Sequence, residues 1–98
     1  MSKPLQHAKY LRGLPFYNAY DAGSETLVAS TPTTVTPDET LMQLLIYPMI
    51  ACTIKFNESE KVVHCPAEAY TPITMLVEEF VLESIEAGDV YWTGYYLT

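Results

Sequence analysis

The sequence predicts a small all-β protein: an antiparallel β-sandwich of jelly-roll type with an extended N-terminal arm. From Thr26 onward, short runs of β-branched and aromatic residues alternate with turn residues, at the spacing typical of sandwiches and barrels. A chain of 98 residues can bury one core, so a single compact domain is expected. The 49% hydrophobic content and eight tyrosines are too apolar for a disordered chain.

Residues 1–24 are predicted to form the arm. They follow no period of 2 or 3.6 residues, and two prolines and two glycines interrupt any regular element. Residues 1–20 carry three cations and no acid, whereas residues 21–98 contain all twelve acids against two lysines. Because its apolar side chains are unfavourable in water, we expect the arm to lie against a neighbouring protein. The arm residues predicted at this interface are Leu5, Lys9, Tyr10, Leu11, Arg12, Phe16 and Tyr17.

Residues 25–98 are predicted to form the sandwich domain. Strands are expected near residues 27–30, 33–36, 41–47, 51–56, 61–65, 73–77, 80–85 and 90–97. The strands around the polar loop 57–60 are predicted to form a hairpin in which Ile54 faces Val63 and Cys52 faces Cys65. The core side of this hairpin would then be Ile50, Cys52, Ile54, Phe56, Val63 and Cys65.

Two segments also carry helix signals. Residues 36–47 begin with a possible cap, a first-turn proline and Glu39, and residues 71–88 place Leu76, Phe80 and Ile85 on one helical stripe. The β-branched residues of the second segment, and the short turn that leads from it into the last strand, favour strands instead. We therefore predict strands for both segments.

No arrangement of residues in the sequence indicates catalysis. The two histidines have no acid and nucleophile placed for a triad, and no phosphate loop or dinucleotide motif occurs. We expect no enzyme activity, no cofactor and no metal. The acids at positions 78, 79, 83, 86 and 89 are interpreted as a solvated acidic edge, because no loop has the ligand spacing of a calcium site.

The two cysteines leave two interpretations open. As cross-strand neighbours, Cys52 and Cys65 could form a disulfide, although directly opposed positions are strained for that bond. In a reducing cytoplasm, two buried thiols are the favoured state.

Charge and hydropathy exclude further classes of partner. A net charge of −7 argues against binding the phosphate backbone of nucleic acids, which requires clustered cations. The longest apolar run, residues 41–52, is too short for a membrane helix, and no secretory signal is recognised. We expect a protein that folds in a cytoplasm and binds neither nucleic acid nor membrane.

The C-terminal stretch VYWTGYYLT is apolar on both of its faces. Strand alternation places Val90, Trp92, Gly94 and Tyr96 on one side and Tyr91, Thr93, Tyr95 and Leu97 on the other. Tyrosine and tryptophan are preferred interface anchors, so this strand is predicted to serve both the core and a subunit interface. The interface residues predicted here are Tyr91, Trp92, Tyr95 and Leu97.

The turns and strands from Thr33 onward follow a recognisable order. A turn follows Thr36-Pro37, a long apolar strand comes next, IKF is followed by VVHCPAEAY with its proline-alanine turn, and IEAGDVYW closes the domain. In this order of elements the chain resembles the small β-sandwich accessory proteins of tailed-phage virions, including capsid decoration or cement proteins and head-fibre or tail-accessory domains.

The resemblance implies a virion structural protein, made in the host cytoplasm, that decorates or stabilises the capsid. Its expected partners are other virion proteins, above all the major capsid protein, and further copies of itself, with the trimer as the form that the resemblance implies. The alternative is a carbohydrate-binding or host-adsorption module of a tail or head fibre, which would need exposed rings to stack on sugars.

Overall fold

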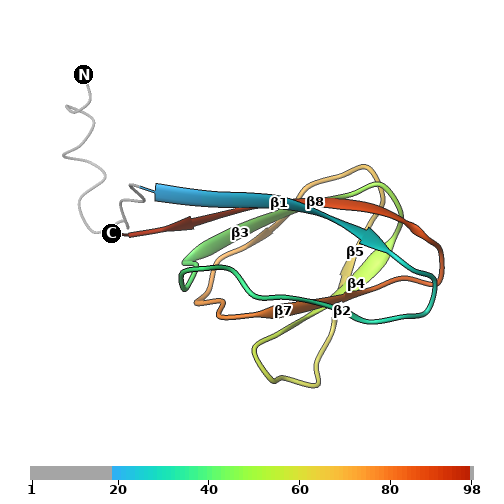
Figure 1. Ribbon diagram of the computed structural model, residues 1–98, viewed down its shortest axis with the longest axis horizontal. Helices are drawn as coiled ribbons and strands as arrows, with labels where there is room; N and C mark the ends of the chain where they lie inside the picture. Colours follow the sequence, from blue (N-terminus) through green and yellow to red (C-terminus); the bar gives the residue numbers. More distant parts are fainter. Residues whose placement is uncertain (1–18, 98) are drawn as a thin grey trace.

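The fold is all-β in the computed structural model, which describes residues 19–97 (Figure 1). Eight strands form two four-stranded antiparallel sheets, and no helix occurs among the described residues. The strands are β1 Ala19–Leu27, β2 Thr33–Val35, β3 Gln43–Pro48, β4 Cys52–Phe56, β5 Val63–Cys65, β6 Thr71–Ile73, β7 Phe80–Glu83 and β8 Gly88–Tyr96.

The strand order crosses repeatedly between the two sheets. Sheet A has the order β1-β8-β3-β6 and sheet B the order β2-β7-β4-β5, so only β4 and β5 are consecutive strands that pair with each other. The first and last strands pair along their full length, from Ala19 opposite Tyr96 to Leu27 opposite Gly88. The two sheets lie one above the other in Figure 1, with β1, β3 and β8 in one layer and β2, β4 and β7 in the other.

One hydrophobic core joins the two sheets. Strand alternation turns every second residue inward, so that β8 contributes Val90 and Trp92 and β7 contributes Phe80 and Leu82. The rings of Phe80 and Trp92 meet edge to face across the core, with centroids 5.5 Å apart. The remaining core residues are Leu27, Val35, Leu41, Leu44, Ile46, Cys52, Ile54, Phe56, Cys65 and Val77.

The predicted hairpin register is confirmed. Cys52 lies opposite Cys65 and Ile54 opposite Val63. The core prediction is wrong at Val63, which is 39% exposed, because β5 is the edge strand of sheet B and little covers it. Both segments that carried helix signals contain strands and no helix, as predicted. The sixth strand is displaced, however: it was predicted at residues 73–77, and β6 spans Thr71–Ile73.

The first strand differs from the prediction. A strand was expected at residues 27–30 and an arm over residues 1–24, but residues 19–24 belong to β1, which ends at Leu27. Its alternation is inverted: Asp21 and Glu25 point to the inner side and are only half-buried, while Tyr20 points outward. A pattern with acids on the inner side does not resemble an amphipathic strand in the sequence. The rest of the predicted arm, residues 1–18, lies outside the described part of the chain.

Two groups of loops close the opposite ends of the sheets. We call residues 28–32, 49–51, 66–70 and 84–87 the four-loop end. Hydrogen bonds join these loops and the adjoining strand ends: Ser30 N donates to Ser84 O at 2.7 Å, Glu68 N to Pro48 O at 2.7 Å, and Ser84 Oγ to Ala51 O at 2.8 Å.

We call the opposite group, residues 36–42, 57–62 and 74–79, the acidic end. Asn57 connects two of its loops: its backbone lies in the left-handed region at φ 54, and its Oδ1 accepts a hydrogen bond from Glu78 N at 2.8 Å. The acids of this end are Asp38, Glu39, Glu58, Glu60, Glu78 and Glu79.

Candidate functional site

The outer face of sheet A is the largest aromatic surface in the described part of the chain. We call it the tyrosine face. Strand alternation turns Tyr20, Tyr91 and Tyr95 outward, together with Tyr47 of β3. Tyr70 precedes β6, and its ring packs on that of Tyr47 with centroids 4.8 Å apart. Small or uncharged residues fill the remaining positions, namely Ala22, Ser24, Thr26, Gln43, Leu45, Pro72 and Thr93.

The register arranges these side chains in rows across the sheet. Tyr20 lies opposite Tyr95, which lies opposite Gln43. Four residues further along, Ser24 lies opposite Tyr91, which lies opposite Tyr47. Aromatic rings therefore occupy both sides of the face, and the shorter side chains of Ala22, Thr93 and Leu45 lie between them. A face of this kind offers rigid rings and apolar area to a partner.

The tyrosine face carries one charge among its described residues. Asp89 lies at the end of the face beside the four-loop end, and its Oδ1 accepts a hydrogen bond from Thr26 Oγ1 at 2.9 Å. Residues 19–97 contain all twelve acids of the chain and only Lys55 and Lys61 as fixed cations. On a body with that charge, a nearly uncharged face is the surface that can approach another acidic protein with the least repulsion.

A packed layer supports the tyrosine face from below. The indole of Trp92 lies under β1, where a Cβ added to Gly23 would come within 2.9 Å of its Nε1. At Gly94 an added Cβ would come within 2.3 Å of Leu41 Cδ1. Both glycines let bulky core residues press against the inner side of the sheet, which holds the outward rings in place. Trp92 Nε1 is buried and has no hydrogen-bond partner among the described residues.

The predicted site residues fall into three groups. Tyr91 and Tyr95 lie on the tyrosine face, and Leu97, which is 48% exposed, follows the end of β8. Trp92 is only 6% exposed and belongs to the core, and its assignment to an interface stays a prediction. The predicted arm residues Leu5, Lys9, Tyr10, Leu11, Arg12, Phe16 and Tyr17 all lie outside the described residues.

Sequence reasoning missed three members of the face. Tyr47 alternates with the core residues Leu44 and Ile46, so its outward direction could have been inferred from strand phase. Tyr20 was hidden by the inverted alternation of β1. Tyr70 lies outside every strand, and only its tertiary contact with Tyr47 brings it to the face.

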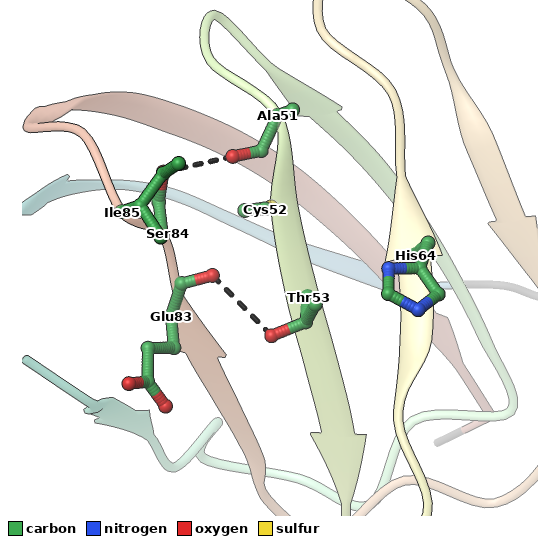
Figure 2. Close-up of a pocket in the computed structure, with 7 residues that line it drawn as sticks. All are labelled: Ala51, Cys52, Thr53, His64, Glu83, Ser84 and Ile85. Atoms are coloured by element: carbon green, nitrogen blue, oxygen red, sulfur yellow. Dashed lines mark hydrogen bonds between the residues drawn. The ribbon is translucent and has the colours of Figure 1, made fainter. Parts of the chain in front are cut away.

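A hollow of about 350 Å³ lies between β4 and β7 at the four-loop end (Figure 2). The two strands pair from Phe56 opposite Phe80 to Thr53 opposite Glu83 and then separate. Beyond that point the Ser84 side chain, rather than the backbone, links β7 to Ala51. The lining is formed by Ala51, Cys52, Thr53, His64, Glu83, Ser84 and Ile85.

The hollow is mainly apolar and has an acidic rim. Ile85 at its lip is 84% exposed, the most exposed of the large hydrophobic residues in the described part of the chain. Glu83 lines the hollow with its backbone and carries its carboxylate on the adjoining surface of β7 (Figure 2), and Glu86 follows Ser84 closely, its N–H donating to Ser84 Oγ at 3.1 Å. The hollow therefore suits an apolar side chain flanked by positive charge.

The Cys52 thiol borders this hollow and interacts with Cys65 in the adjacent strand. Both cysteines are free and buried. The hydrogen bond with Cys65, and burial in addition, raise the pKa of the Cys52 thiol. The same hydrogen bond lowers the pKa of Cys65 to about 7, helped by a hydrogen bond with Thr71 and opposed by burial. Because the two thiols interact directly, they titrate as a pair.

The predicted acidic edge is divided between distant parts of the fold. Glu78 and Glu79 lie at the acidic end, Glu83 borders the hollow, and Glu86 and Asp89 flank the start of β8. Within residues 19–97, no group of three or more histidine, cysteine or acidic side chains is placed to hold a metal ion. The same residues include no helix long and apolar enough to cross a membrane.

Comparisons with known proteins give no relative to set beside this site: no protein family, no curated protein and no solved structure matches the chain.

Proposed function

We propose that this chain is a virion structural protein that docks on neighbouring virion subunits through its tyrosine face and its N-terminal arm. The observation that carries the proposal is the composition of the tyrosine face, which has five tyrosines and a single charge at its end. Interface centres are depleted of charge and enriched in aromatic residues. Three long strands offer a face on the order of 500 Å², within the range in which exposed patches are often functional.

The strand order supports a jelly-roll sandwich as the fold type. Eight strands divided as β1-β8-β3-β6 and β2-β7-β4-β5 match the two interlocked Greek keys of a jelly roll. Viral capsid proteins and lectins both use this architecture. The fold type is thus compatible with the virion role and with the carbohydrate-binding alternative, and the chemistry of the face has to separate them.

The charge pattern favours a protein partner. A body with twelve acids and two lysines approaches an acidic capsid surface most easily through its uncharged face, while the cations of residues 1–18 can pair with acids on that surface. The expected partners are the major capsid protein and further copies of this chain. Binding, and not catalysis, is the role assigned to the tyrosine face.

The first test is the composition of particles purified from the virus that encodes the chain. We expect mass spectrometry to find this protein in many copies per particle. Presence in infected cells but absence from purified particles would contradict a structural role.

The second test compares two matched charge insertions on recombinant protein. Tyr20→Glu places an acid on an exposed position of edge strand β1 in the tyrosine face, and Thr34→Glu does the same on edge strand β2 of sheet B. We expect Tyr20→Glu to reduce co-sedimentation with particles that lack the protein by about tenfold or more, the loss of one interface anchor. The Thr34→Glu control should bind normally, and equal binding by both variants would exclude the tyrosine face as the docking surface.

One observation favours glycan binding as a second candidate function. Tyr70 is 68% exposed, and the plane of its ring is tilted by 46° from that of Tyr47, so the two neighbouring rings face different directions. Aromatic rings exposed in this way can stack on sugar rings. Because Trp92 is buried, its fluorescence is a poor reporter, and a glycan array with Tyr70→Ala as the control is the better measurement. Saturable binding that Tyr70→Ala abolishes would establish this function in place of protein docking.

A further inference from the structure

The hollow between β4 and β7 lies on a part of the surface that the tyrosine face does not include. Cys52 and the exposed Ile85 line it, and Glu83 borders it with its backbone while its carboxylate lies beside the hollow on the far side of β7 (Figure 2). The four-loop end around it contains three more large exposed hydrophobic residues, Val28, Met49 and Tyr70, the last of which belongs to the tyrosine face. An apolar hollow of this size can hold one or two large side chains.

The charges of the four-loop end and of the adjoining end of β7 are negative, namely Glu68, Glu83 and Glu86. The two lysines lie toward the other end of sheet B: Lys55 is two residues beyond Thr53 on the same outward side of β4, and Lys61 follows the turn after β4. The further titratable side chains in the lining are His64 and the Cys52 thiol. The complementary ligand is an apolar or aromatic peptide segment with cations on both sides.

The N-terminal arm contains such a segment. Residues 9–12 read Lys-Tyr-Leu-Arg, so that two large apolar side chains lie between two positive charges. The only other cation before residue 19 is Lys3, which has no comparable pair of apolar residues and second cation beside it. Charge and apolar content therefore both single out residues 9–12.

The length of the chain decides which copy supplies the segment. Nine residues connect Tyr10 to Ala19 and span at most about 30 Å. Ala19 begins β1 at the end far from the hollow, and β1 itself is about 30 Å long, while stacked sheets are separated by roughly a further 10 Å. The segment of the same chain would have to be almost fully extended around the body to reach its own hollow, which is entropically costly, whereas that of a second copy has no such restriction.

We infer that the hollow between β4 and β7 binds residues 9–12 of a second copy, with Tyr10 and Leu11 in the apolar part and Lys9 and Arg12 near Glu83 and Glu86. This inference rests on the proposed function, because it assigns an acceptor site to the arm. The donor segment and the acceptor hollow are different surfaces, so the contact is heterologous and joins copies head to tail into a ring or a row.

The direct test is photo-crosslinking from position 10 of the full chain. Tyr10→p-benzoylphenylalanine is prepared as an equal mixture of light and ¹⁵N-labelled protein, irradiated and digested. We expect crosslinked peptides that join position 10 to residues 51–53 or 83–85 and that combine light and heavy chains. Crosslinks confined to single-isotope pairs, crosslinks to the tyrosine face, or no crosslinks at the hollow would each overturn the inference.

A matched pair of variants tests the hollow itself. Ile85→Glu adds a charge at the lip, and Val28→Glu adds the same charge at an exposed position of the same end that does not line the hollow. Ile85→Glu is expected to weaken self-association by about tenfold, measured by sedimentation velocity, while Val28→Glu leaves it within about threefold. Equal effects of the two variants would contradict specific binding at the hollow.

Charge exchange provides an independent test. Arg12→Glu should weaken self-association, and adding Glu83→Arg in the same chain should restore it at least in part, because the double variant re-forms an opposite-charge pair. A double variant as weak as Arg12→Glu, with Glu86→Arg equally ineffective, would overturn the assignment of the cations.

The two proposals fail separately. If the hollow crosslinks are absent but Tyr20→Glu still abolishes particle binding, only the head-to-tail contact is wrong. If the crosslinks form but the chain is absent from particles, the virion role is wrong and the contact between copies remains.

Discussion

The outer face of sheet A carries five tyrosines and one carboxylate at its end, whereas the outer face of sheet B carries Lys55, Glu83 and His64 among threonines and one valine. Both sheets have four antiparallel strands and share one core. Both inner faces supply apolar side chains to that core, although β1 also turns Asp21 and Glu25 inward, whereas the outer faces differ in kind. An inner face is determined by the need to bury apolar area, but an outer face is free to be selected for a partner.

The strand lengths of the two sheets differ in the same direction. Sheet A contains the nine-residue strands β1 and β8, while no strand of sheet B exceeds five residues. A long paired strand keeps its outward side chains in a fixed order over its whole length. The sheet with the more continuous surface is thus the one that carries the aromatic rings, as a docking face requires.

The largest expected effect is a difference in unfolding free energy between substitutions on the inner and the outer side of β8. Trp92→Ala should lower the free energy of unfolding by about 3–5 kcal/mol, because it removes a buried indole that packs on Phe80 and beneath Gly23. Tyr91→Ala, one residue away on the tyrosine face, should cost less than about 1 kcal/mol. Urea denaturation measures both, and similar losses for the two variants would show that the tyrosine face belongs to the folded core.

A disulfide between Cys52 and Cys65 should stabilise sheet B alone. Both thiols are on adjacent strands in direct register and already interact. One thiol can attack glutathione disulfide to form a mixed disulfide and release one reduced glutathione. The second thiol then attacks the mixed disulfide, forms the Cys52–Cys65 bond and releases a second reduced glutathione. Closing a loop of this length is worth about 2–3 kcal/mol.

Intact mass and thermal melting measure this effect. We expect a loss of two hydrogens and a higher melting temperature, with hydrogen exchange slowed in β4 and β5 more than in β1. Cys65→Ser is the control and should not respond to the oxidant. A lower melting temperature after oxidation would show that the opposed positions strain the bond more than the closed loop stabilises it.

A smaller effect is expected at Asn57 in the acidic end. Asn57→Ala should cost about 2 kcal/mol, because the change removes hydrogen bonds to Glu78 N and Leu76 O and leaves a Cβ residue at positive φ. Asn57→Gly removes the same side-chain bonds but tolerates the backbone, so it should cost about 1 kcal/mol less. If Gly were no better than Ala in chemical denaturation, backbone conformation would have no part in the effect.

The smallest effect concerns the single charge of the tyrosine face. Asp89→Asn keeps an oxygen that can accept from Thr26 Oγ1 and removes the carboxylate from an exposed position. The free energy of unfolding should therefore change by less than about 0.5 kcal/mol. A loss above about 1 kcal/mol in urea denaturation would mean that the carboxylate supports the fold rather than bordering a neutral face.

Much of the fold could be predicted from the sequence. Strand alternation and turn residues indicated eight strands and the all-β class, and the polar loop at residues 57–60 was enough to align Cys52 with Cys65. These features depend on local periodicity and short loops, which a single sequence contains. The same reasoning failed at β1, because its inward acids do not follow the usual alternation.

The sequence by itself determined the phases of the strands after β1, the two apolar sides of β8 and the separation of cations from acids along the chain. Only the tertiary structure decided which strands are neighbours, and therefore that Tyr20, Tyr47, Tyr70, Tyr91 and Tyr95 meet on one face. It also decided that Trp92 is buried and that β4 and β7 separate to leave a hollow beside Cys52. The physical reason is that phase is a local property of each strand, whereas pairing between distant strands depends on the closure of the whole core.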